Sequence, residues 1–195
     1  FEKIDYDMTL GNRASEIPSR MRSIFGGPEP REVDFAKAAK SLQYVIEYAQ
    51  EHGVAPFHHI HLRTMIETKE DADKMLAHAP GLFLLLDTGH LCSAKSDPLA
   101  VIGAHGGRIA HVHLKDFHAV EPKTWDHRRS KWDEEGYFAE LGKGNMGLNL
   151  PRILEALEEI GYDGWISVEL DRPWPHSDPF EAAKANREYL KSLGY

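Results

Sequence analysis

Short apolar runs and amphipathic helical segments alternate along most of the chain. Helices are expected over residues 34–52 and 151–160, where apolar residues recur every three or four positions. The apolar runs that predict strands cover residues 4–10, 55–62, 82–86, 109–114 and 165–170. Strands that alternate with helices favour a parallel sheet with helices outside it, in about five β/α units.

Helix-start signals support this division. Thr68 and Asp71 have the spacing of a capping box, and Asp97 and Asp178 each precede a proline. An aspartate followed by proline is typical of an N-cap and the first helical position. We therefore expect one α/β domain over residues 1–195.

One long segment, residues 117–149, interrupts the alternation. It holds Trp125, Arg128 and Trp132 and ends in a glycine-rich stretch at 142–147. Loops of this length inside a compact domain are usually functional or disordered. We expect a long loop that forms a lid or cap over one end of the sheet.

Composition narrows the class of protein. The 195 residues are 42% hydrophobic and 28% charged, which suits one soluble globular domain without a membrane partner. A single cysteine, Cys92, excludes a disulfide framework and a CxxC zinc site. The net charge of −8 disfavours nucleic acid as a partner. No signal-peptide pattern opens the sequence, so a cytoplasmic location is expected.

Polar residues stand at the carboxyl ends of four apolar runs: His59, Asp87, His113 and Glu169. Strand ends converge at one face of a parallel β/α fold, where such enzymes keep their active sites. Two imidazoles and two carboxylates suit Mn, Co, Fe, Ni or Zn as a divalent metal cofactor. A metal ion would also offset the cost of clustering two carboxylates.

Each donor also has a purely structural interpretation. A single histidine at a strand end is more often hydrogen-bonded in the core or at the surface, and Asp87 can be a turn residue before a helix. Glu169 comes directly after Trp-Ile-Ser-Val at 165–168, where a carboxylate would be buried and would need a partner. Four donors on four strand ends are the stronger signal.

Four stretches resemble the sugar phosphate isomerase/epimerase superfamily, the xylose isomerase-like TIM barrels. They are HHIHLRTMIET at 58–68, LLLDTGHL at 84–91, RIAHVHLKD at 108–116 and GYDGWISVELDRP at 161–173. The nearest members are inosose dehydratase-like. The resemblance implies a (β/α)8 barrel, a sugar or polyol substrate and a divalent metal held by Glu, Asp, His and Glu. Asp87, His113 and Glu169 match three of these ligands, and His59 stands in place of the first glutamate.

The resemblance also implies a reaction. With one of the two glutamates replaced, the two-carboxylate device of the sugar epimerases is incomplete, which favours loss of water next to a ketone. That reaction needs a base, an electrophile on the carbonyl and an acid. We expect the metal to bind the carbonyl oxygen, and neighbouring side chains to transfer protons and bind the substrate hydroxyls. The catalytic candidates are Glu169, His61, His90 and Lys115, and the substrate-binding candidates are His90, Lys115, Asp116 and Arg172.

The barrel is expected to be incomplete. A full barrel takes ~250 residues, and by analogy the first three strands are missing before Phe1. Two unpaired sheet edges would then favour a homo-oligomer. Three alternatives to the dehydratase stay open: a sugar isomerase or epimerase of the same superfamily, a non-catalytic sugar-binding partial barrel, and, least favoured by the charge, an apurinic endonuclease.

Overall fold

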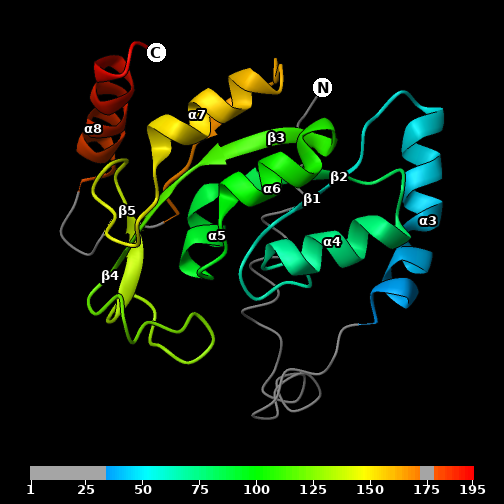
Figure 1. Ribbon diagram of the computed structural model, residues 1–195, viewed down its shortest axis with the longest axis horizontal. Coiled ribbons are helices and arrows are strands. Elements are labelled where there is room, and N and C mark those ends of the chain that lie inside the picture. Colours follow the sequence, from blue (N-terminus) through cyan, green and yellow to red (C-terminus); the bar gives the residue numbers. More distant parts are fainter. Residues whose placement is uncertain (1–33, 172–177) are drawn as a thin grey trace.

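The computed structural model describes residues 34–171 and 178–195 (Figure 1). The expected strand at 4–10 lies outside them. The described strands are β1 (Phe57–His59), β2 (Phe83–Asp87), β3 (Ile109–Leu114), β4 (Asp116–Ala119), β5 (Gly136–Ala139) and β6 (Ile166–Val168). The helices are α3 (Phe35–Glu51), α4 (Lys69–His78), α5 (Thr88–Ser93), α6 (Pro98–His105), the short 3-10 helix η1 (Gly106–Arg108), α7 (Leu150–Glu159) and α8 (Pro179–Ser192).

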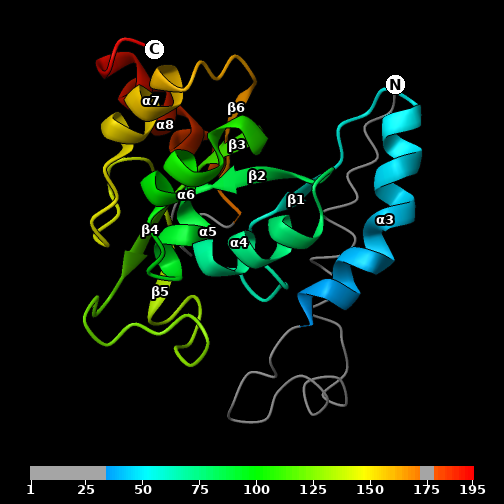
Figure 2. The ribbon, with the colours of Figure 1, turned by 45° about the vertical axis from the view of Figure 1, so that its right-hand side comes forward.

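Four strands form a parallel sheet in the order β1-β2-β3-β6. Between successive strands the chain returns through helices, as the alternating pattern predicts. The helices α3, α4, α6 and α7 contact one another in this order along the sheet (Figures 1 and 2). This is the arrangement of part of a β/α barrel, and it confirms the predicted fold class.

The two faces of the sheet differ in chemistry. Leu84, Leu86 and Val112 belong to the main apolar core together with residues of α4, α6 and α7. Alternate residues of the same strands lie on the other face, among them Asp87 and His113. Because successive strand residues point to opposite faces, one face makes the core and the other carries polar groups.

The helix caps follow the sequence signals. Thr68 and Asp71 form a reciprocal capping box at the start of α4. Asp97 and Asp178 cap α6 and α8, each with proline at the first helical position. Asp34 caps α3 through the backbone N–H of Lys37. Each cap satisfies an amide that lacks a partner within its helix.

Two strands are shorter than predicted. The run at 55–62 gives only β1, because the chain turns after Ile60 and the His61 N–H bonds to the Ile66 carbonyl instead of to β2. The run at 165–170 gives only β6. In the described part of the chain, β1 and β6 are the outer strands of the sheet. Trp165, beside β6, is 82% exposed.

The segment at 117–149 is more ordered than a plain loop. It contains most of an antiparallel pair, β4 and β5, which projects from the sheet beyond β3 (Figure 2). Phe117, Trp125 and Phe138 form an aromatic cluster within it. The Trp125 indole N–H donates to the carbonyl of Ser93 at 2.7 Å. The segment is thereby packed against the end of α5.

Candidate metal centre

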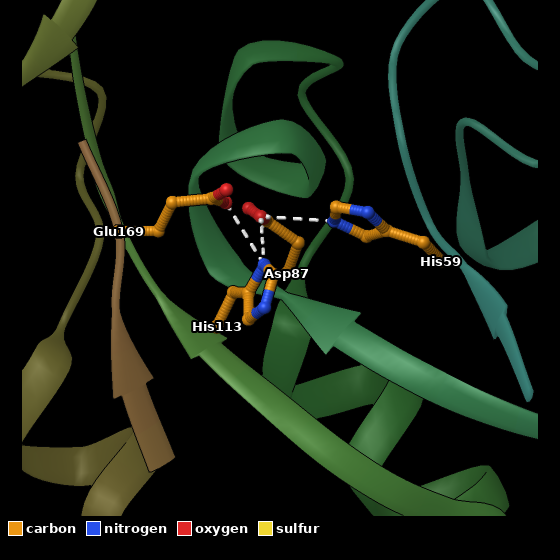
Figure 3. A group of neighbouring side chains, drawn as sticks. All are labelled: His59, Asp87, His113 and Glu169. Carbon is orange, nitrogen blue, oxygen red and sulfur yellow. Dashed lines mark hydrogen bonds and ion pairs between the residues drawn. The ribbon is translucent and has the colours of Figure 1, made fainter. Parts of the chain in front are cut away.

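Four side chains from four strand ends point toward one another (Figure 3). One donor atom from each of His59, Asp87, His113 and Glu169 lies within 4.8 Å of the others. The structure thus brings together all four residues that the sequence proposed as metal ligands.

The strand register explains the convergence. Asp87 pairs with His113 across β2 and β3, and His113 pairs with Ser167 across β3 and β6. Glu169 is two residues beyond Ser167, and its N–H bonds to the carbonyl of Leu114. Residues two apart on a strand share a face, so all these side chains lie at the same end of the same face.

Asp87 lies at the centre of the group and uses its two oxygens differently. Oδ1 accepts a hydrogen bond from the His90 backbone N–H at 2.9 Å and so caps α5. Oδ2 lies 3.2 Å from His59 Nε2 and 3.5 Å from His113 Nδ1. The turn interpretation and the ligand interpretation of Asp87 therefore apply to different atoms of one carboxylate.

Glu169 completes the group from the sheet edge. Its Oε2 lies 2.8 Å from His113 Nδ1 and 2.6 Å from Lys115 Nζ. It has the partners that the sequence predicted, but the side chain is 34% exposed rather than buried. The reason is that β6 is an outer strand of the described sheet, so that its far side is open.

The electrostatics keep both carboxylates ionised. Burial alone would raise the pKa of Asp87, but the Lys115 ammonium and the nearby imidazoles hold that pKa well below its ordinary value. Burial likewise opposes ionisation of Glu169, yet its contacts with His113 and Lys115 lower the pKa to about 2. Burial lowers the pKa of His113, and the two carboxylates outweigh this and raise it.

The donor set fits a divalent ion. His113 Nδ1 and Glu169 Oε2 are buried and touch each other, yet neither atom makes a hydrogen bond of good geometry. Asp87, Glu169 and Asp171 bring three negative charges, against which Lys115 brings one positive charge. Mixed nitrogen and oxygen donors with an excess of negative charge suit Mn, Fe, Co, Ni or Zn better than Ca or Mg.

The predicted catalytic residues surround this group. The His61 ring lies against the His90 ring in a tilted arrangement, with centroids 3.7 Å apart, and meets the His59 ring edge to face at 5.0 Å. Burial lowers the pKa of both His61 and His90, so both imidazoles are neutral near pH 7. Lys115 Nζ lies 3.3 Å from His90 Nε2 and 3.3 Å from Asp87 Oδ2. His61, His90, Lys115 and Glu169 are therefore contiguous.

Of the two remaining site candidates, the structure describes only Asp116. Asp116 is buried and holds the glycine-rich turn: it accepts hydrogen bonds from the backbone N–H groups of Phe117, Gly142 and Gly144. These contacts join it to the turn rather than to the donor group. Arg172 lies outside the described residues.

Sequence reasoning missed Asp171 as a site residue. Its Oδ2 lies 3.0 Å from Lys115 Nζ and 3.8 Å from His90 Nε2. The signal was present in the spacing: Asp171 comes two residues after Glu169, as Glu169 does after Ser167, and residues two apart in an extended chain point the same way. Phe138, 4.5 Å from Lys115 Nζ, could not be placed from the sequence because it comes from β5.

Relatives with known names match this chain over most of its length. The inosose dehydratase of Geobacillus thermodenitrificans is 34% identical over 191 residues, covering 94% of this chain and 63% of that protein. The inosose dehydratase of Clostridium beijerinckii is 32% identical over 165 residues, covering 82% and 55%. The rhizopine catabolism protein MocC of Rhizobium meliloti is 33% identical over 170 residues, covering 85% and 52%. The chain spans between 52% and 63% of the length of these relatives.

Solved structures support the fold. An L-ribulose 3-epimerase superposes with a TM-score of 0.63 at 22% identity, over 87% of this chain and 57% of that one. The probable 3-DHS dehydratase AsbF of Bacillus anthracis superposes with a TM-score of 0.60 at 18% identity, over 80% and 56%. Residues 3–193 match the family described as xylose isomerase-like TIM barrel. The resemblance seen in the sequence is thus confirmed, and the chain belongs to the xylose isomerase-like TIM barrel family.

Proposed function

We propose that this chain carries the metal centre and proton-transfer groups of a metal-dependent lyase, which removes water next to the ketone of an inosose or a related polyol ketone. The observation that carries the proposal is the convergence of His59, Asp87, His113 and Glu169 within 4.8 Å at four strand ends. The inosose dehydratases among the relatives support the choice of substrate class.

Loss of water beside a ketone needs a base for the α-proton, an electrophile on the carbonyl and an acid for the departing hydroxyl. A divalent ion held by the four donors would supply the electrophile as a Lewis acid. The neutral imidazoles of His61 and His90 are placed to accept a proton. The carboxylates of Asp87, Asp171 and Glu169 raise the pKa of Lys115 against the effect of burial, so its ammonium keeps its proton and is placed to donate a hydrogen bond to a substrate hydroxyl.

The alternative of a sugar isomerase or epimerase remains open to test. One structural neighbour is named as an epimerase, but at 22% identity the similarity supports a shared fold and not a shared reaction. The donor group contains a single glutamate, Glu169, because His59 occupies the end of β1. Two opposed glutamates are thus not available in this group, which favours elimination over epimerisation.

The proposal is tested by incubating the chain with Mn²⁺ or Co²⁺ and an inosose. Dehydration would create a product that absorbs in the near ultraviolet and has lost the mass of one water, whereas epimerisation conserves mass. His113→Ala should abolish the signal. His105→Ala should retain it, because His105 lies at the end of α6 and contacts only Asp73 among its described ion pairs. Equal turnover in both variants would refute the proposal.

A further inference from the structure

The Lys115 ammonium lies between two groups of side chains that could each hold a metal ion. It is 2.6 Å from Glu169 Oε2 and 3.3 Å from Asp87 Oδ2, both in the first group. It is also 3.0 Å from Asp171 Oδ2 and 3.3 Å from His90 Nε2. Together with His61, these two residues form a second group whose donor atoms lie within 4.8 Å of one another.

The second group by itself could hold a metal ion. His61 and His90 offer nitrogen and Asp171 offers oxygen, the same mixture as in the first group. The two groups share Lys115 as a neighbour, so a pair of ions bound there would both lie beside its ammonium. Unlike a two-metal centre, this site has a lysine ammonium between the two groups of donors.

The surroundings of Lys115 fix it in this position. Its side chain is fully buried. The Thr88 hydroxyl accepts from the Lys115 N–H at 2.9 Å and donates to the Lys115 carbonyl at 2.6 Å. A Cβ on Gly89 would come within 2.6–2.9 Å of the lysine stem, and the Phe138 ring lies 4.5 Å from Nζ. At the start of α5, Thr88 thus fixes the backbone of Lys115 and Gly89 leaves room for its side chain.

Three carboxylates compensate the charge of the Lys115 ammonium. A buried ammonium without partners would be strongly disfavoured, but oxygens of Asp87, Glu169 and Asp171 all lie within 3.3 Å of Nζ. A divalent ion in the second group would adjoin this ammonium, and like charges a few ångströms apart repel strongly in a buried site.

We propose that Lys115 takes the place of a second metal ion. The chain binds one divalent ion at the first group, which consists of His59, Asp87, His113 and Glu169. The second group, His61, His90 and Asp171, surrounds the ammonium and binds no ion. The inference rests on the metal centre of the proposed function. It assigns to Lys115 a fixed positive charge that remains when the metal is removed.

Metal stoichiometry tests the inference. Titration with Mn²⁺ followed by calorimetry, with elemental analysis of the gel-filtered chain, should give one ion per wild-type chain. Lys115→Ala should bind two, and the double variant Lys115→Ala, Asp171→Asn should return to one. Two ions in the wild type, or only one in Lys115→Ala, would overturn the inference. No ion in the wild type would instead refute the metal centre itself, and the inference with it.

A second variant guards against loss of the fold in Lys115→Ala. Lys115→Met keeps an apolar stem and removes only the charge, and circular dichroism checks that it folds. The ion at His59, Asp87, His113 and Glu169 should bind ~10-fold tighter or more in this variant, because the repulsion is gone. Unchanged or weaker binding would contradict the inference. Lys37→Met is the matched control, because Lys37 is exposed on α3. It should change neither the number of ions bound nor their affinity.

Discussion

Asp87 and His113 stand directly opposite each other in the β2–β3 ladder, with Asp87 Oδ2 3.5 Å from His113 Nδ1. The same carboxylate caps α5 through its other oxygen. The backbone that ends β2 therefore positions one side of the candidate metal centre, and the same residue caps the helix that follows.

Substitution can separate the two roles of the Asp87 carboxylate, as a helix cap and as a metal ligand. Asp87→Asn keeps an oxygen that can cap α5 but loses the negative charge, so metal affinity should fall by at least ~100-fold while the cap is retained. Asp87→Ala should lose metal binding and be about 1 kcal/mol less stable than Asp87→Asn, because it also lacks the cap. Calorimetric titration with Mn²⁺ and urea unfolding measure the two effects. Equal stability of the two variants would contradict a capping role.

Glu67 joins two parts of the chain that are distant in sequence. Its Oε2 lies 2.9 Å from Arg128 Nη2 and 3.5 Å from His127 Nε2, and its Oε1 accepts from the Arg63 N–H. Burial opposes ionisation of Glu67, but these contacts lower its pKa to about 2. The carboxylate thus ties the segment at 117–149 to the loop after β1.

The pH dependence follows from that pKa. Because the pKa is lower in the folded chain than its ordinary value of 4.5, the stabilisation is complete above pH 4.5 and is lost as the pH falls toward 2. The contribution is at most about 3 kcal/mol. Glu67→Gln should lower the free energy of urea unfolding at pH 7 and flatten its decline in acid. Glu134→Gln, in an exposed pair with Lys131, should leave both unchanged.

Much of the site could be predicted because it depends on local rules. Apolar runs that end in a polar residue located His59, Asp87, His113 and Glu169, and the shared edge of parallel strands predicted their convergence. Aspartate or threonine before a helical pattern located the caps of α4, α6 and α8. These features depend on a few neighbouring residues and on strand parity, so one sequence suffices.

What could not be predicted depends on contacts between distant segments. β4 and β5 pair across the residues that separate Ala119 from Gly136, and no short turn signal marks them as a hairpin. Asp116 resembles a site residue in sequence, yet its carboxylate binds the backbone of the glycine-rich turn. The exposure of Glu169 depends on which strand lies outside β6, which the local sequence does not specify.

The turn held by Asp116 has a strict steric requirement. A Cβ on Gly144 would collide with Asp116 Oδ1 and with the Phe117 carbonyl. Gly144→Ala should therefore displace the turn and destabilise the chain by about 1–3 kcal/mol. Gly103→Ala is the control, because a Cβ there meets nothing within 4 Å and the residue lies within α6. It should be neutral or stabilising by about 0.5–1 kcal/mol. Urea unfolding compares the two.

The outer edge of β6 predicts self-association. In the part of the chain that the structure describes, β6 pairs only with β3, and Trp165 and Ile166 beside this edge are exposed. Exposed strand edges are templates for pairing with other chains, and a charged residue on the edge prevents this. The apparent mass in sedimentation or gel filtration should therefore rise with concentration, and Ile166→Lys should suppress that rise. Val45→Lys changes an equally apolar exposed position on α3 and should not. A wild-type chain that stays monomeric at every concentration would show that this edge is covered.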